Sequence, residues 1–558
     1  MSATALDGDL RRAVVRWIAD DPSPADAAEL KGILADAMAG DAAAIGELTD
    51  RMSAPLAFGT AGLRGPLRAG PAGMNLAVVR RAAAGIAAYL RNVGSAGESV
   101  VIGYDARHRS AEFAHDAAGV LAAAGFRVLL APSALPTPLT AFGVRSLGAV
   151  AGLMVTASHN PPNDNGLKVY LAGGTQLVWP ADVQIEAAIA AAPAGVAIDA
   201  TGQAQPWPDS LIGDYLDRAA AVATGGAKSL RIAATPMHGV GGETLVKALY
   251  QAGFSDVHMV AEQAVPDPDF PTVAFPNPEE PGAADLLLAL ATAIDADLAI
   301  ANDPDADRCA IGIKDVNGIW RMLTGNETGA LLGDRVLRGL DRGAHPDPLV
   351  ATTIVSSAML KSIAAQHDVR FDETLTGFKW IVRAGDGDGT GLVFGFEEAL
   401  GLCVDPTVVR DKDGISAAVL ACDLAATLKA GGRHITDALD DLARQHGLHA
   451  TDQLSFRVAD LSLITDGMAR LRGNIPIELL GETVLTTKDL LPQTDAVVLH
   501  TERVRVVIRP SGTEPKLKCY LEIITPVGVD DDLTAIREAS AGQLTALKSE
   551  LREVLQLG

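Results

Sequence analysis

Short apolar runs alternate with longer amphipathic segments along most of the chain. The runs at 100–103, 127–131 and 149–155 are typical of buried strands. Between the first two lies the Ala-rich segment 111–124, whose apolar positions favour a helix. This alternation predicts an α/β fold with parallel sheets and crossover helices.

The first fifty residues have a different pattern, because their apolar positions recur at helical spacing without intervening strands. One amphipathic stretch includes Leu10, Val14 and Ile18, and a second covers 25–38. We expect an N-terminal helical extension that packs on the first domain.

The alternation of strands and helices resumes after residue 230 and continues to the C-terminal region. Arg231, Asp297, Leu349 and Leu392 begin further short apolar runs. The segment 503–508 alternates charged and apolar residues, which predicts a strand with one exposed face. At roughly 150 residues per domain, the length predicts about four domains. From the Pro- and Gly-rich breaks we place them at 1–207, 208–323, 324–446 and 447–558.

Composition narrows the possible partners and the compartment. Acidic residues outnumber basic ones by 69 to 46, so the net charge is −23, which disfavours nucleic acid and anionic lipid as partners. No run of about 18 apolar residues exists, so we expect no membrane span. The four cysteines form no Cys-x-x-Cys pair and the N-terminus has no signal-peptide core, which favours a cytoplasmic protein.

Residues 156–160 (Thr-Ala-Ser-His-Asn) follow the apolar run that ends at Val155. Strand ends are a usual place for chemistry in α/β domains, which makes Ser158 a candidate nucleophile. His159 is adjacent and Lys168 lies ten residues further on. The prolines and Asn-Gly of 161–166 predict a loop with a tight turn. Ordinary turn chemistry explains this segment equally well when it is taken alone.

Three aspartates, Asp303, Asp305 and Asp307, follow another predicted strand. Carboxylates at alternate positions can converge on one divalent cation. An EF-hand is excluded because Arg308 and Lys314 occupy the positions that need Gly and Glu. Mg²⁺ is therefore the expected ion, since it takes few carboxylates and completes its shell with phosphate oxygen and water. The alternative is an acidic surface turn.

Three further loops carry residues suited to a phosphorylated ligand. The Gly-rich segment 58–65 includes Arg64, whose guanidinium is suited to phosphate. The segment 509–518 holds two hydroxyls, a glycine and three cations, a combination that favours phosphate binding. Glu397 and Glu398 follow an apolar run and could be an acid/base pair or acceptors for sugar hydroxyls.

With these loops in this order, the chain resembles the α-D-phosphohexomutase superfamily. The matching motifs are Thr-Ala-Ser-His-Asn-Pro, Asp-Pro-Asp-Ala-Asp-Arg, Gly-Phe-Glu-Glu-Ala-Leu-Gly and Arg-Pro-Ser-Gly-Thr-Glu-Pro-Lys. The N-terminal extension, Gly-Thr-Ala-Gly-Leu-Arg-Gly and Thr-Leu-Thr-Gly-Phe-Lys-Trp resemble the branch of bacterial α-phosphoglucomutases and animal phosphoglucomutase-2/phosphopentomutases. The resemblance implies three related mixed α/β domains and a C-terminal α+β domain around a central cleft.

The resemblance also implies a role for individual residues. Ser158 would be the phosphoserine, and the metal ligands would be Ser158, Asp303, Asp305 and Asp307. The implied catalytic residues are Ser158, His159, Lys168, Arg64 and Arg308. The implied substrate-binding residues are Thr60, Thr376, Gly377, Lys379, Glu397, Arg509, Ser511, Gly512, Thr513 and Lys518. Many relatives have Glu-x-Ser in the sugar loop, whereas Ala399 stands at the serine position here, which leaves the sugar identity open.

The implied activity is reversible phosphate transfer between O1 and O6 of a hexose phosphate through a sugar bisphosphate. Mg²⁺ would be the cofactor and a sugar 1,6-bisphosphate the activator. Glucose phosphates are the expected substrates, with mannose or pentose phosphates as alternatives. Two other classes stay open: a phosphatase or mutase with Asp303 as nucleophile, and a non-catalytic sugar-phosphate-binding protein.

Overall fold

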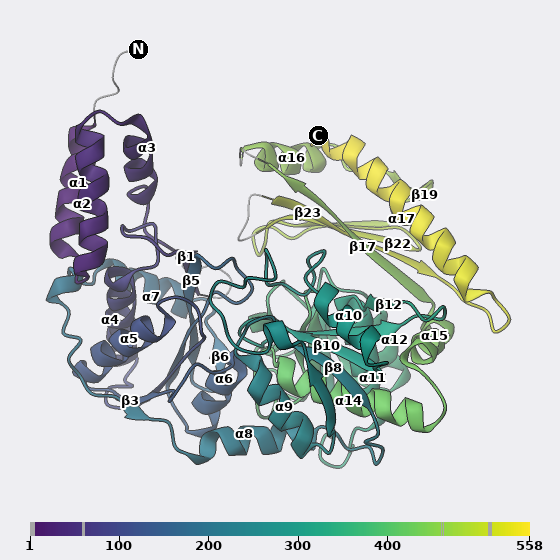
Figure 1. The fold of residues 1–558 in the computed structure, drawn as a ribbon. Coiled ribbons are helices and arrows are strands. Elements are labelled where there is room, and N and C mark those ends of the chain that lie inside the picture. Colours follow the sequence, from purple (N-terminus) through teal and green to yellow (C-terminus); the bar gives the residue numbers. More distant parts are fainter. Residues whose placement is uncertain (1–5, 58–61, 459, 461, 512–515, 558) are drawn as a thin grey trace. The chain divides into compact units, whose positions relative to one another are not determined.

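A computed structural model describes residues 6–57, 62–458, 460, 462–511 and 516–557 (Figure 1). The chain divides into two compact units. The first comprises Met1–Thr224, Leu230–Cys309 and Asp405–Val419. The second comprises Gly225–Ser229, Ala310–Val404 and Leu420–Gly558. The chain therefore passes between the units several times.

The first unit begins with three helices, α1 (Gly8–Asp20), α2 (Pro24–Met38) and α3 (Ala42–Arg51). Their N-termini are capped by the side chains of Asp7, Ser23 and Asp41 respectively. Their apolar faces form one small core. Arg109 in the following domain makes a 2.8 Å ion pair with Asp26 of α2. Helices α1 and α2 lie where the sequence predicts the helical extension, and α3 was not expected from the sequence.

The next sheet has the order β1-β5-β4-β2-β3-β7, with β6 paired to β5. Strands β2, β3 and β4 are parallel, as the alternation predicted. β5 is antiparallel to both β4 and β1, so the sheet is mixed. The strands are β1 (Leu63–Pro66), β2 (Ser99–Tyr104), β3 (Arg127–Leu130), β4 (Ala151–Val155), β5 (Asp164–Leu171), β6 (Thr175–Gln176) and β7 (Gln205–Pro206).

The tight turn predicted at Asn165-Gly166 is wrong, because both residues lie inside β5. The chain turns earlier, and this short connection makes β5 antiparallel to β4. Asn165 uses its side-chain amide to donate to the His108 carbonyl and the Ser110 hydroxyl, each at 2.9 Å. A Cβ at Gly166 would lie 2.5 Å from the Leu63 carbonyl oxygen. Gly166 thus allows the close approach of β1, which carries Arg64.

Helices cover both faces of this sheet (Figure 1). α4, α5 and α7 pack together on one face, while α6 and α8 contact each other on the other. The helices are α4 (Leu76–Asn92), α5 (Ser110–Ala123), α6 (Thr137–Ser146), α7 (Ala181–Ala190) and α8 (Ser210–Ala221), with a short 3-10 helix at Gly195–Ala197.

A second set of parallel strands completes the first unit. β8 (Arg231–Thr235) lies between β9 (Asp256–Met259) and β10 (Leu298–Asn302). The connections contain α9 (Gly241–Gln251), a 3-10 helix (Ala261–Gln263), the predicted proline-rich loop and α10 (Asp285–Ala293). β10 is fully buried and delivers the three-aspartate loop at its carboxyl end.

The second unit contains a sheet with the order β14-β13-β15-β16. β13 is parallel to β14 and β15, whereas β16 is antiparallel to β15. The elements are β12 (Trp320–Met322), α11 (Gly325–Arg338), β13 (Leu349–Thr353), α12 (Met359–Gln366), β14 (Arg370–Thr374), α13 (Phe378–Ile381), β15 (Leu392–Glu397), β16 (Gly401–Cys403) and α15 (Ile435–His446). β11 (Cys309–Lys314) and α14 (Gly414–Ala430) run from one unit into the other.

The C-terminal part of this unit is an antiparallel sheet with the order β17-β23-β22-β21-β20. Its apolar face packs against α16 and α17 in one large core. The elements are β17 (Leu448–Arg457), α16 (Ser462–Gly473), β18 (Glu478–Leu479), β19 (Glu482–Thr483), β20 (Thr486–Asp489), β21 (Val497–His500), β22 (Val504–Pro510), β23 (Lys516–Thr525) and α17 (Leu533–Leu555).

The exposed face predicted for the strand at 503–508 is wrong, because the first five residues of β22 are all buried. Val507 packs against Ile354 and Val355 in a second apolar cluster. Arg505 lies on the same side and donates to the carbonyls of Ile354 and Ser356 at 2.6 and 2.8 Å. The charged residue is therefore buried by a tertiary contact that the alternation does not reveal.

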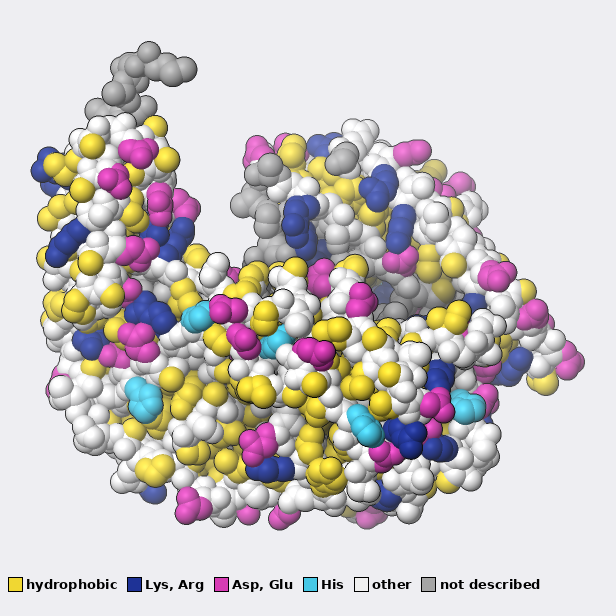
Figure 2. Space-filling view, viewed as in Figure 1, with side chains coloured by type: hydrophobic (Ala, Val, Ile, Leu, Met, Phe, Trp, Pro, Cys, Tyr) yellow, Lys and Arg dark blue, Asp and Glu magenta, His cyan; other side chains and the backbone are white. Residues whose placement is uncertain are grey.

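On the face shown in Figure 2, acidic and basic side chains are interspersed between apolar ones. Among the described residues, no single helix has the length and apolar character needed to cross a membrane. The sharply bent pair α14 and α15 meets those two criteria only when taken together.

Candidate active site

Ser158 lies directly beyond β4, where its hydroxyl faces the three-aspartate loop. Its Oγ is 3.0 Å from Asp303 Oδ2 and 3.2 Å from His159 Nδ1. The residue is only 3% exposed, and its φ of +54° is in the left-handed region. A non-glycine residue there carries a strain of about 1–2 kcal/mol, so the surrounding contacts must hold it.

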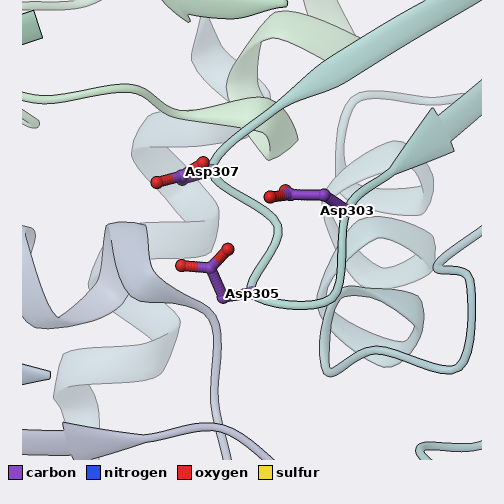
Figure 3. A group of neighbouring side chains, drawn as sticks. All are labelled: Asp303, Asp305 and Asp307. Carbon is purple, nitrogen blue, oxygen red and sulfur yellow. The ribbon is translucent and has the colours of Figure 1, made fainter. Parts of the chain in front are cut away.

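Asp303, Asp305 and Asp307 converge from one loop after β10 (Figure 3). All three are fully buried, and one oxygen from each carboxylate lies within 4.8 Å of the others. The predicted alternative of an acidic surface turn is therefore wrong. The cause is the buried strand that precedes the loop, which places the aspartates in the interior.

Lys168 of β5 is the cation closest to this group. Its Nζ is 2.6 Å from both Asp305 Oδ2 and Asp307 Oδ2, and its side chain is 2% exposed. Burial alone would lower the pKa of Lys168, but the two carboxylates outweigh burial and raise it. Lys168 therefore carries its proton at neutral pH.

The carboxylates differ in charge environment. Burial and the neighbouring Asp305 and Asp307 raise the pKa of Asp303 well above its usual value. Burial also opposes ionisation of Asp307, but Lys168 and Lys412 outweigh it and lower the pKa of this group. The two lysines therefore favour the ionised form of Asp307, whereas burial and the neighbouring carboxylates disfavour that of Asp303.

The donor set fits a divalent cation. Oδ1 of Asp305 and Oδ1 of Asp307 are buried and have no hydrogen-bond partner within the described part of the chain. Unsatisfied buried carboxylate oxygens are costly, and a hard cation would satisfy them. The three carboxylates can therefore hold a metal ion.

Three further predicted residues lie at this site. Arg64 donates from Nη1 to Asn160 Oδ1 at 2.9 Å, and burial lowers its pKa. The backbone N–H of Arg308 donates to Asp303 Oδ1 at 3.0 Å. Burial lowers the pKa of His159 well below its usual value, so its imidazole is neutral. All five predicted catalytic residues are therefore gathered in the first unit.

Sequence reasoning missed three residues of this site. Lys412 Nζ is 3.3 Å from Asp307 Oδ2, and Thr137 Oγ1 donates to Asp305 Oδ2 at 2.5 Å. Arg107 donates to the backbone of the Ser158 loop. Lys412 lies just before the start of α14, and Arg107 lies just after the end of β2. Their positions next to the ends of these elements were the only sequence signal that could have indicated a role at the site.

The predicted sugar-binding residues lie in the second unit. Glu397 ends β15, and Glu398 accepts a 3.0 Å hydrogen bond from Ser356 Oγ. A Cβ at Gly325, the first residue of α11, would lie 1.9 Å from the Glu398 carbonyl oxygen. Because Gly325 has no side chain, the loop that carries Glu397 and Glu398 can lie close to α11. The other predicted residues here precede or begin α13: Thr376, with a buried Oγ1, Gly377 at φ +115°, and Lys379, with Nζ 5.8 Å from the Trp380 ring centroid.

The predicted phosphate-binding residues are found at the ends of β22 and β23. Arg509 is directly opposite Lys518 in the antiparallel pair, so the two cations share a face. The backbone N–H of Ser511 donates to the Lys516 carbonyl at 2.8 Å. Thr60, Gly512 and Thr513 lie outside the described residues.

Four domain families match this chain in succession. They are the phosphoglucomutase/phosphomannomutase alpha/beta/alpha domains I, II and III, over residues 55–194, 213–318 and 324–446, and the C-terminal domain over 455–527. The chain belongs to the phosphoglucomutase/phosphomannomutase family. It is therefore a phosphomutase, an isomerase that moves a phosphoryl group within its substrate.

Relatives in this family cover most of the chain. A probable phosphomannomutase of Haemophilus influenzae is 44% identical over 81% of this chain and 93% of its own length. A phosphopentomutase of Mus musculus is 32% identical over 95% and 93% of the two chains. A phosphoglucomutase of Staphylococcus epidermidis is 35% identical over 86% and 92%.

Solved structures of the family have the same fold. A putative phosphomannomutase from Thermus thermophilus superposes with a TM-score of 0.69 at 26% identity, over 90% of this chain and all of that one. A family member from Burkholderia thailandensis gives a TM-score of 0.67 at 19% identity, over 88% and 97%. The predicted mixed α/β architecture with four domains is confirmed.

Proposed function

We propose that this phosphomutase reversibly transfers phosphate between O1 and O6 of a hexose phosphate through a phosphoserine at Ser158. The observation that carries this proposal is the position of the Ser158 hydroxyl, 3.0 Å from Asp303 in a buried group of carboxylates and cations. Phosphoryl transfer depends mainly on positioning and on neutralising charge at the phosphoryl oxygens. Ser158, Arg64, Arg308 and Lys168 provide both.

Each transfer exchanges one P–O bond for another. The free hydroxyl oxygen of the sugar monophosphate bonds to phosphorus while the Ser158 Oγ–P bond breaks, which yields a sugar bisphosphate. The sugar hydroxyl gives up its proton and Ser158 Oγ takes one. Lys168 is suited to donate, since its raised pKa keeps it protonated, and neutral His159 is suited to accept. The bisphosphate then turns around and returns its other phosphate to Ser158.

Asp303, Asp305 and Asp307, with a phosphoserine oxygen of Ser158, would hold Mg²⁺. The ion would supply positive charge against the oxygens of the transferring phosphoryl group. Two carboxylate oxygens that have no hydrogen-bond partner among the described residues support this assignment. A sugar 1,6-bisphosphate would act as activator, because it can phosphorylate Ser158 when the serine has lost its phosphate.

The other predicted substrate-binding residues would hold the sugar and the phosphate that is not transferring. Glu397 would accept hydrogen bonds from sugar hydroxyls, and Thr60, Thr376, Gly377 and Lys379 would also bind the substrate. The phosphate that is not transferring would bind Arg509, Ser511, Gly512, Thr513 and Lys518. The paired cations Arg509 and Lys518 support this role. We assign these functions to segments 1–207 (phosphoserine), 208–323 (metal), 324–446 (sugar) and 447–558 (phosphate).

We propose glucose phosphates as the preferred substrates, as in the related phosphoglucomutases. A second candidate is mannose phosphate, which the 44% identity to a probable phosphomannomutase favours. A panel of glucose, mannose and pentose 1-phosphates, assayed for kcat/KM with added bisphosphate, decides between them. The highest kcat/KM for glucose 1-phosphate is expected, and a higher value for mannose or ribose phosphate contradicts the preference.

The variant Ser158→Ala tests the proposed nucleophile. Turnover should be abolished while glucose 1-phosphate still binds, because the serine contributes the reacting oxygen and not the sugar contacts. Retained turnover would favour Asp303 as nucleophile. A wild-type protein that binds all sugar phosphates without converting any would instead indicate a binding protein. We also propose a cytoplasmic location, which is supported by the four buried cysteines, since they form no disulfide within the described residues.

A further inference from the structure

Arg107, in the short loop after β2, binds the backbone of the Ser158 loop with both terminal nitrogens of its guanidinium group. Its Nη2 donates to the carbonyls of Ser158 and Asn160, both at 2.6 Å. Its Nη1 donates to the carbonyls of Pro161 and Asp164 at 2.8 and 3.2 Å. The side chain is 1% exposed. One buried cation therefore gathers four carbonyl dipoles from the segment that begins at the reactive serine.

A second chain of contacts fixes the other side of Ser158. The backbone N–H of Ser158 donates to Thr156 Oγ1 at 2.9 Å. The same hydroxyl donates to Asp105 Oδ2 at 2.7 Å, and this oxygen lies 3.3 Å from Arg107 Nε. The Ser158 carbonyl is thus hydrogen-bonded directly to Arg107. The Ser158 N–H is connected to Asp105 through the Thr156 hydroxyl.

These ties explain how Ser158 keeps its left-handed conformation. At φ +54° a serine is strained, and only surrounding contacts can maintain the conformation. If the ties were lost, rotation to a negative φ would change the direction of the Cα–Cβ bond and move Oγ away from Asp303. The ring of Phe270 covers the Arg107 guanidinium, with the ring centroid 4.9 Å from Cζ. This contact further restricts the position of the Arg107 side chain.

A lysine could not reproduce this arrangement. Arginine presents five donors in a planar fork, and here Nη1 and Nη2 serve four acceptors while Nε faces Asp105. A lysine has three donors on a single nitrogen, so it cannot donate to acceptors that lie on two sides of a planar group. The residue type at 107 is therefore specified by the geometry of the loop it binds.

We propose that Arg107 is a positioning residue for phosphoryl transfer, which holds Ser158 so that its Oγ faces the metal-binding aspartates. This inference rests on the proposed role of Ser158 as the phosphoserine. The N–H groups of Arg107 Nη1 and Nη2 donate to carbonyls of the Ser158 loop. Arg107 therefore affects catalysis by positioning Ser158 and not by binding the sugar. Its loss should reduce kcat and leave the KM for the sugar phosphate unchanged.

The test uses the full-length enzyme with Mg²⁺, added glucose 1,6-bisphosphate and the substrate that the panel above identifies. In Arg107→Lys and Arg107→Ala, kcat should fall about 10- to 100-fold with KM unchanged, as expected for a misplaced reacting group. Guanidinium at millimolar concentration should restore part of the activity of Arg107→Ala, whereas methylammonium at the same concentration should not. A general structural role would not produce this selective rescue.

Two further variants keep the result interpretable. Thr156→Val removes the hydrogen bond that the Ser158 N–H makes, without burying or removing a charge. It should therefore also lower kcat at constant KM, which can be measured even if the Arg107 variants fail to fold. Arg80→Met is the matched control, because Arg80 is partly buried in the same domain and forms a double ion pair with Asp116. It should lower the melting temperature but leave kcat unchanged.

Wild-type kcat in folded Arg107→Lys and Arg107→Ala, or a raised KM at constant kcat, would overturn the positioning role. Wild-type kcat in Thr156→Val would overturn the claim that the Ser158 backbone must be held. If Ser158→Ala is itself active, the phosphoserine proposal fails first, and this outcome is distinguishable because Ser158→Ala carries intact Arg107 contacts.

Discussion

Lys168→Met removes the cation between Asp305 and Asp307 while keeping a side chain of similar length. In the native protein Lys168 Nζ is 2.6 Å from one oxygen of each carboxylate. Asp307 keeps a second cation, since Lys412 Nζ is 3.3 Å away. Asp305 keeps only the Thr137 hydroxyl among the polar contacts that the described residues show at its Oδ2. The variant therefore leaves Asp305 as a buried carboxylate without its cation.

The size of the effect follows from this geometry. Removing one partner of a buried ion pair typically costs about 3–5 kcal/mol, because the remaining charge is uncompensated. For a large domain this corresponds to a fall in melting temperature of about 5–10 °C. Loss of a positioned acid should also lower kcat by about 10²- to 10⁴-fold.

Calorimetry with and without Mg²⁺, together with steady-state kinetics, measures both effects. In EDTA, Lys168→Met should melt well below wild type, and Mg²⁺ should narrow the gap because the ion compensates the same carboxylates. Lys168→Arg is the control, since it keeps a buried cation and should recover much of the stability. A melting temperature equal to wild type in EDTA, with kcat unchanged, would refute the proposed charge balance.

Two further predictions concern the second unit. Burial would raise the pKa of Glu522, but its hydrogen bond with His449 and the positive charge of Arg505 outweigh burial and lower the pKa below its usual 4.5. The stability that ionised Glu522 contributes is therefore present above pH 4.5 and lost as the pH falls through the lowered pKa. Glu522→Gln should melt below wild type at pH 7, and the gap should close in acid; a gap independent of pH contradicts this. Gly325→Ala should raise the KM for the sugar phosphate, because its Cβ would meet the Glu398 carbonyl oxygen at 1.9 Å, whereas Gly213→Ala, with open space around it, should not.

The sequence predicted those parts of the fold and site that depend on local pattern. The strand before Ser158, the strand before Asp303 and the helices predicted at 25–38 and 111–124 follow from apolar periodicity, and all are found. The family resemblance correctly indicated the four-domain architecture.

Apart from α3, the missed features depend on contacts between distant segments. Arg107 meets the Ser158 loop only because β2 and β4 are neighbours, and Lys412 comes from more than a hundred residues beyond Asp307. Arg505 looked solvent-exposed by alternation, but it is buried against carbonyls of Ile354 and Ser356. Asn165 suggested a turn from its local sequence, but tertiary acceptors hold its side chain within β5.

The central claim is that one phosphoryl group passes between Ser158 and either end of a sugar. The most direct test is to incubate the enzyme with glucose 1,6-bisphosphate carrying ³²P, map the labelled peptide, and then add unlabelled glucose 1-phosphate with Mg²⁺. We expect acid-stable label at Ser158, which should move into sugar phosphate at a rate no slower than kcat. Label on an aspartate, or label at Ser158 that the sugar cannot remove at the turnover rate, would contradict it.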